Sequence, residues 1–130
     1  MTHYFDDPRL VSVLDLDRIL LLRSLDGGKG AFLDELIDLF VSSTPPVLEG
    51  LISAIEVHSI GESVALAHKL KGISSNVGIS CLVAMLERVE VFFADMAVEE
   101  RKNLPAALTA AYQLAITTLL NEWHAGHKSL

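Results

Sequence analysis

The sequence predicts an all-α protein, an antiparallel up-down-up-down four-helix bundle with a short additional N-terminal helix. Apolar residues recur at helical spacing along almost the whole chain, and no convincing alternating pattern typical of β-strands is present. The 130 residues fit one domain, and 51% of them are hydrophobic, which is sufficient to build a core. Long helical segments with short connections favour antiparallel neighbours. We therefore expect residues 1–130 to form a single domain.

The first two helices are expected on either side of a glycine-rich turn. The short helix covers about residues 15–24 and ends before the turn at 26–28. The second extends from about residue 30 towards 57. Its segment Thr44-Pro45-Pro46 predicts a kink or short break, because proline removes a backbone donor and clashes with the preceding turn. The expected apolar stripe of this helix consists of Phe32, Leu36, Leu39, Phe40, Val47, Leu51 and Ile55.

The third helix is the informative one. It should begin at a capping box, in which Ser59 and Glu62 bond each other's backbone amides, and end near Gly78, a left-handed terminator. Stepping ~100° per residue places an apolar stripe opposite His68, so His68 should point to solvent. That expected core stripe consists of Leu66, Leu70, Ile73 and Val77. The exposed face around His68 consists of Gly61, Val64, Ala65, Lys71, Gly72 and Ser75.

The last two helices complete the predicted bundle. The fourth is expected over about residues 79–97, and the fifth begins at Asn103 as a cap, with Pro105 in its first turn. The core face of the fourth helix is Leu82, Leu86, Val89 and Phe93. The core face of the fifth is Leu108, Tyr112, Ala115, Leu119 and Trp123.

The exposed face of the third helix combines a nucleophile, a cation and open space. Gly72 follows His68 by one turn, and a glycine inside a helix costs ~1 kcal/mol relative to alanine. The missing side chain would let a bulky partner approach the imidazole, a nucleophile in its neutral form. Lys71 is within reach of an anion attached to His68. Because phosphoryl transfer depends on positioning and charge neutralisation, this face predicts a phosphoryl acceptor.

Residues 67–78 resemble the signature of histidine-phosphotransfer (HPt) domains, roughly A-H-x-L-K-G-x-S-x-x-(apolar)-G. The resemblance covers about residues 12–95. Residues 32–40 resemble the second helix of that family, and Leu82, Leu86 and Glu90 resemble its next helix with a closing acidic residue. The residues after the fourth helix show no family pattern.

The resemblance implies a role for each motif residue. His68 would accept a phosphoryl group from a receiver-domain aspartate and pass it to another response regulator. Lys71 matches the lysine that neutralises the phosphoryl group, and Gly72 matches the glycine that gives the partner access. Ser75 is a candidate for a hydrogen bond to the phosphoryl group, and Gly78 matches the glycine that ends the helix.

The resemblance also implies partners. They are response-regulator receiver domains and a hybrid sensor histidine kinase, with Mg²⁺ on the receiver and no cofactor on this chain. Val64 and Ala65 are candidates for the docking face. The family leads us to expect a monomer and a phosphocarrier without its own ATP-binding site. Ile73 departs from the small or polar residue of many members, but it falls on the expected core stripe.

Composition and charge exclude several other classes. The formal charge of −7 disfavours nucleic acid and anionic membrane surfaces as partners. The N-terminus lacks the pattern of a signal peptide, and charges interrupt the apolar segments before ~20 residues, so no transmembrane helix is expected. The single cysteine, Cys81, suits a reducing cytoplasm, which is the expected location.

Other signals are weaker than the HPt motif. Residues 27–30, Gly-Gly-Lys-Gly, lack the spacing of a phosphate-binding loop and predict a turn. Near the C-terminus, His124 and His127 are possible metal ligands, and Glu122 and His3 could join them. Two histidines fall short of the three or four ligands of a closed metal site, so no metal site is predicted.

Three alternatives are weaker. The intact set His68, Lys71 and Gly72 argues against an interaction module without phosphotransfer, and the missing ligand cluster argues against a metal-dependent helical hydrolase. The third is an HPt module phosphorylated directly by a chemotaxis-type kinase, whereas Leu70 and Ser74-Ser75 look more like the hybrid-sensor or free-standing type.

Overall fold

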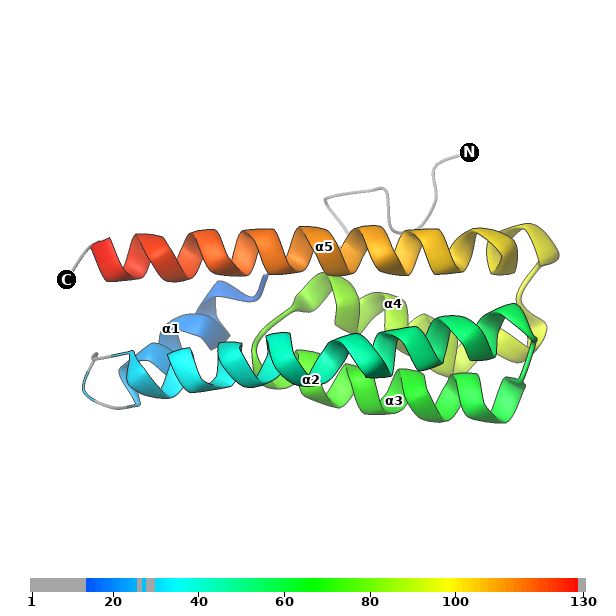
Figure 1. Ribbon diagram of the computed structural model, residues 1–130, viewed down its shortest axis with the longest axis horizontal. Helices are drawn as coiled ribbons and strands as arrows, with labels where there is room; N and C mark the ends of the chain where they lie inside the picture. The colour runs from blue at the N-terminus through cyan, green and yellow to red at the C-terminus, as the bar shows by residue number, and fades with distance from the viewer. Residues whose placement is uncertain (1–13, 26, 28–29, 129–130) are drawn as a thin grey trace.

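The computed structural model describes residues 14–25, 27 and 30–128, apart from the side chains of Leu16 and of residues 122–128. In this part of the chain the structure is helical and contains no strand, so the predicted all-α class is confirmed (Figure 1). The elements are α1 (Leu16–Ser24), α2 (Ala31–Glu56), α3 (Ile60–Asn76), α4 (Ser80–Phe92), the 3₁₀ turn η2 (Phe93–Asp95) and α5 (Val98–Lys128).

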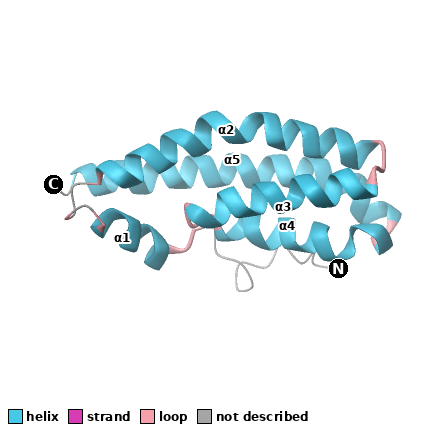
Figure 2. Cartoon of the chain, turned by 90° about the horizontal axis from the view of Figure 1, so that it is seen from below, coloured by secondary structure: helices cyan, strands magenta, loops and turns pink. Residues whose placement is uncertain are grey.

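The four longer helices lie side by side along the long axis of the molecule. Figure 1 shows α2 and α4 running towards one end and α3 and α5 running towards the other. The most extensive contacts of α3 are with α2 and α4, while α5 contacts the same two helices. Figure 2 shows α1 apart from this group, below the N-terminal half of α2, which it contacts. The large side chains buried most completely are Phe40, Phe93, Leu22, Leu33, Leu51, Leu70, Ile79, Leu82, Leu86, Leu108 and Leu119.

The end of α3 anchors α1. Asp15 caps α1 by accepting a hydrogen bond from the amide of Arg18 at 3.2 Å, and its own amide donates to the Gly78 carbonyl at 2.7 Å. Gly78 has a φ of 74°, and a Cβ there would lie 3.2 Å from the Asp15 carbonyl oxygen. Only glycine combines this left-handed conformation with so close an approach. The predicted helix end at Gly78 and the predicted span of α1 are therefore confirmed.

Of the kink or short break predicted at the double proline, the break is wrong, because α2 continues through Pro45 and Pro46. A residue before proline normally avoids the helical conformation. Thr44 keeps it, and its buried hydroxyl contacts the Phe40 carbonyl at 2.5 Å and the Tyr112 hydroxyl at 2.6 Å. The Tyr112 contact joins this part of α2 to α5, and Figure 2 shows α2 curving along its length.

The predicted core face of α2 is partly wrong. Phe32 and Leu39 are 40% and 59% exposed, and the adjacent Leu33 and Ile37 are buried instead. In α3, Leu70 and Val77 are buried as expected, whereas Leu66 and Ile73 are only half-buried at the edge of the core. The α3 positions that share the buried face are Ser63, Ala67 and Ser74. Small side chains fit there because α3 lies against both α2 and α4.

The predicted start of α5 is also wrong, since the helix begins at Val98 and contains Asn103 and Pro105 in its interior. Glu99 and Glu100 lie in the first turn, where negative charge favours a helix N-terminus. Of the expected core face, Leu108, Tyr112, Ala115 and Leu119 are buried as predicted, and the side chain of Trp123 lies outside the described residues. All four predicted core residues of α4 and η2 are buried as well.

In the described part of the chain, α2 is long and apolar enough to cross a membrane by length and composition alone. Asp38 and Glu49 interrupt its apolar sequence, so the expectation that charges break every apolar segment well short of ~20 residues holds for α2 as well. The core helix of a soluble protein passes the same test. Leu51, Ala54 and Ile55 of α2 are buried in the core of this bundle, whereas Leu39 and Val41 of the same helix are exposed.

Candidate functional site

The ends of α3 fix the helix that carries the site. Ser59 is the residue before its first turn, as predicted, but the capping box is not formed. The Ser59 amide already donates to the Ala54 carbonyl at 2.9 Å, closing the end of α2, so Glu62 has no free amide to accept from. Burial of Ala67 and Leu70 then sets the rotation of α3. His68 lies on the opposite side with 73% of its side chain exposed, so its predicted surface position is confirmed.

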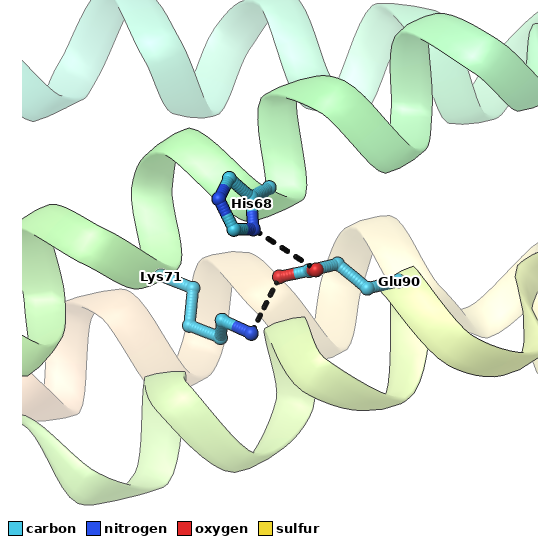
Figure 3. A network of polar contacts seen from close by, with 3 residues as sticks. All are labelled: His68, Lys71 and Glu90. Carbon is cyan, nitrogen blue, oxygen red and sulfur yellow. Dashed lines mark hydrogen bonds and ion pairs between the residues drawn. The ribbon is translucent and has the colours of Figure 1, made fainter.

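One carboxylate joins the imidazole to the neighbouring lysine. Glu90 of α4 places Oε2 at 3.1 Å from His68 Nδ1 and Oε1 at 2.8 Å from Lys71 Nζ (Figure 3). The Glu90 side chain is 18% exposed and that of Lys71 25%. Two elements therefore build the site: α3 supplies the imidazole and the amine, and α4 supplies the acceptor between them.

The charge on Glu90 determines which imidazole nitrogen is free. Partial burial acts to raise the pKa of Glu90, but hydrogen bonds and positive charge from Lys71 and His68 outweigh it and hold the pKa below its ordinary value. The carboxylate is then ionised at neutral pH and can only accept hydrogen bonds. In the neutral imidazole, His68 Nδ1 must therefore carry the proton, which leaves the lone pair on Nε2. Figure 3 shows Nδ1 turned towards Glu90 and the other ring nitrogen turned away.

The surface around His68 away from Glu90 is formed by small side chains and is open. A Cβ built on Gly72 would meet nothing within 4 Å, so no internal packing requires glycine at this position. Ala65 is also exposed, whereas Val64 is half-buried against the core on the flank nearer α4. A partner would thus meet small side chains beside His68, which is the geometry expected of a docking face.

Ser75 lies on the exposed face but does not reach the imidazole. It follows His68 by seven residues, which corresponds to about 10 Å along the helix axis. Its carbonyl accepts a hydrogen bond from the Gly78 amide at the helix end. Among the described contacts, none joins Ser75 to His68, so its predicted hydrogen bond to a phosphoryl group stays a prediction.

Sequence reasoning missed the role of Glu90, which it noted only as a closing acidic residue. A signal was present, because Glu90 is the one charged residue in the apolar run 89–93. Among the described residues, no group of three or more His, Cys, Asp or Glu side chains is arranged to hold a metal ion. The side chains of Glu122, His124 and His127, and all of His3, lie outside the described residues.

Comparison with known families assigns the chain. A family model described as "Hpt domain" matches residues 35–125, whereas comparison with curated proteins and with solved structures finds no match. The matched range holds the whole of α3 and α4 with His68, Lys71, Gly72 and Glu90. It also covers most of α5, where the sequence showed us no family pattern, and it leaves out α1. Because the match spans more than half of the sequence, this chain belongs to the Hpt-domain family.

Proposed function

We propose that this protein is a phosphorelay intermediate that accepts a phosphoryl group on His68 from a receiver-domain aspartate and passes it to another response regulator. Hpt domains are histidine-phosphotransfer modules without an ATP-binding site of their own. The observation that carries the proposal is the contact of Glu90 with His68 Nδ1, which leaves an exposed Nε2 as the nucleophile.

The proposed transfer step needs few groups from this chain. The Nε2 lone pair attacks the phosphorus of the aspartyl phosphate, and a nitrogen–phosphorus bond forms as the bond to the aspartate oxygen breaks. The aspartate carboxylate leaves with the electrons of that bond. Because Nδ1 keeps its proton, the imidazole gains positive charge, which the Glu90 carboxylate at 3.1 Å stabilises. Transfer to the next regulator is the same step in reverse, with the aspartate of that regulator as nucleophile.

Lys71 has two places in this cycle. In the structure its amine is paired with Glu90 at 2.8 Å. Its flexible side chain lies one turn from His68, so a phosphoryl group on Nε2 would offer the amine a second anion. We propose that the Lys71 amine shares its positive charge between the Glu90 carboxylate and the phosphoryl group. The charge of the phosphoryl group is then neutralised without a covalent bond from Lys71 that the onward transfer would have to break.

We propose that the partners bind to the face of α3 that carries His68. Receiver domains and a hybrid sensor histidine kinase would dock over Val64, Ala65 and Gly72, with Mg²⁺ held by the receiver. We propose an antiparallel up-down-up-down bundle acting as a monomer in the cytoplasm. A module for protein interaction alone would not require the Glu90 contact, which orients the imidazole for chemistry.

Phosphoryl transfer from a purified phosphorylated receiver tests the proposal, with His68→Gln as control. The wild-type protein should acquire an acid-labile label, as phosphohistidine does, and the variant none. The variant should keep the helicity and unfolding free energy of the wild type within about 0.5 kcal/mol, because the side chain is exposed. Absence of label with a broad panel of receivers, under conditions in which another HPt domain is labelled, would refute the carrier role. Label from an ATP-loaded kinase domain alone would favour the chemotaxis-type alternative.

A further inference from the structure

Glu90 lies in the least secure part of its helix. Helix α4 ends at Phe92, so the carboxylate that contacts His68 belongs to the last helical turn. The last four carbonyls of a helix have no partner within the helix, and helix ends fray. The position of the Glu90 carboxylate therefore depends on contacts that hold this turn from outside α4.

The contact with His68 tolerates little movement of α4. Side chains extend about 5–6 Å from a helix axis, so a rotation of about 10° about that axis moves them by about 1 Å. Such a shift would lengthen the 3.1 Å contact between Glu90 Oε2 and His68 Nδ1 beyond hydrogen-bonding distance. Burial of Val89 and Phe93 holds this turn against the core, but apolar packing is non-directional and does not by itself fix the rotation.

Arg88 ties the same end of α4 to α5. Its Nε donates to Glu100 Oε2 at 2.7 Å, and its Nη2 donates to Glu100 Oε1 at 2.9 Å. Two parallel bonds of this kind fix the relative orientation of the two side chains. The Arg88 guanidinium also lies 5.3 Å from the centre of the Phe92 ring, so the arginine side chain lies along the last turn of the helix.

Glu90 and Arg88 hold α4 from opposite flanks. The two residues are two positions apart, which separates their side chains by about 200° around the helix axis. Glu90 bonds to residues of α3, and Arg88 bonds to Glu100 in the first turn of α5. A rotation of α4 that moved Glu90 away from His68 would therefore also have to break the bidentate pair.

We propose that Arg88 and Glu100 are positioning residues for the phosphoryl acceptor. By fixing the rotation of α4, the pair keeps the Glu90 carboxylate on Nδ1 and so selects the tautomer of His68. Loss of the pair lets the Nε2–H tautomer form, and Nε2 then has no free lone pair in that share of the molecules. The inference rests on the proposed function for its role in transfer, but the tautomer is measured on the protein alone.

Nitrogen-15 NMR of neutral His68 in the full chain tests this role. In Glu100→Gln and in Arg88→Gln, the ratio of the Nδ1–H to the Nε2–H tautomer should fall about fivefold, because part of a charge-assisted hydrogen bond is lost. The double variant should show no further fall, since the two residues act as one pair. Glu99→Gln is the matched control and should keep the wild-type ratio. It removes a charge from the same turn of α5, and none of the described contacts joins Glu99 to Arg88.

Circular dichroism and urea unfolding check the fold and stability of each variant. A loss of unfolding free energy with an unchanged tautomer ratio in both single variants would show that the pair only joins α4 to α5, and would overturn the proposal. An equal fall of the ratio in Glu99→Gln would overturn it as well, because the effect would then come from charge and not from the pair. A wild type that no receiver labels would refute the carrier role, while the tautomer ratios would still decide the positioning role.

Discussion

The outward and inward faces of α3 both contain small residues, but their polar groups differ in whether they have a hydrogen-bond or ion-pair partner. On the outward face, His68 and Lys71 share the Glu90 carboxylate beside the open position of Gly72. On the inward face, Ser63 and Ser74 are fully buried, and within the described structure their hydroxyl oxygens have no hydrogen-bond partner. The exposed polar groups are therefore paired, whereas the buried ones are not.

This difference separates function from packing along one helix. A buried hydroxyl without a partner costs about 1–3 kcal/mol, and an interior glycine about 1 kcal/mol. The buried serines and Gly72 therefore both lower the stability of the protein, but the absence of a side chain at Gly72 leaves space that a partner needs. The inward serines allow α2 and α4 to approach closely, which alanine would allow as well. Substitutions on the outward face should thus alter phosphoryl transfer with little loss of stability. Substitutions on the inward face should alter stability and leave phosphoryl transfer unchanged.

Gly72→Gln should give the largest effect in this comparison. A side chain at this position would hold a receiver away from Nε2, and a displacement of about 1 Å can slow transfer roughly 10²-fold. Because the position is open, the unfolding free energy should stay equal or rise by up to about 1 kcal/mol. Transfer rates and urea unfolding measure both quantities.

Gly72→Ala is the matched control for this change. It gains at least as much helix propensity but adds only a methyl group into open space, so transfer should stay close to the wild-type rate. Normal transfer by Gly72→Gln would refute the argument that this glycine exists for partner access.

Glu90→Gln should slow transfer by about tenfold. A hydrogen bond to a charged group contributes about 1.5–3 kcal/mol, and this one strengthens when the imidazole becomes positive, which gives about tenfold for a partly exposed pair. The amide can also accept from Nδ1 or donate to it, so the tautomer is no longer fixed. Nitrogen-15 NMR of His68 should show a mixture of tautomers in the variant and the Nδ1–H form in the wild type. An unchanged rate together with an unchanged tautomer would remove Glu90 from the mechanism.

The positions of site residues on one helix could be predicted from the sequence, but the contacts between side chains of different helices could not. Helical periodicity placed His68 and Gly72 on the exposed side, because side chains within one helix follow a fixed rotation. The contact of Glu90 with His68 depends on the relative position of α3 and α4, which no periodicity in either helix encodes.

The errors in the fold have the same origin. In α2 both the set containing Phe32 and the set containing Leu33 are apolar, so the packing against the neighbouring helices α1, α3 and α5 determines which set is buried. The double proline was expected to kink or interrupt α2, but the helix is continuous there, where the Thr44 hydroxyl contacts the Tyr112 hydroxyl, 68 residues away. Asn103 has the side chain of a helix cap, yet it lies inside α5 because the helix extends back to Val98.

Replacing the buried serines tests the inward face. Ser74→Ala removes a hydroxyl that has no hydrogen-bond partner and retains the small volume that α2 and α4 require, so it should raise the unfolding free energy by about 1 kcal/mol. Ser63→Ala should behave alike, and transfer should be unchanged in both. Thr44→Val is the contrasting control, because its hydroxyl is bonded at 2.5 and 2.6 Å and its loss should destabilise the protein. Destabilisation by Ser74→Ala would show that the serine hydroxyl is satisfied, and the contrast between the faces would fail.

Acid should weaken the outward pairing, with the smallest effect because the charges are partly exposed. Folding depresses the pKa of Glu90 despite partial burial, through its bonds to Lys71 and His68. Such a carboxylate adds stability above its unfolded pKa, near 4.5, and that stability is lost as the pH falls through the lower folded pKa. Wild type should therefore lose more unfolding free energy between about pH 5 and pH 3 than Glu90→Gln, which does not titrate there. Parallel urea titrations of the two proteins measure the difference, and equal losses would mean that the carboxylate orients His68 without stabilising the fold.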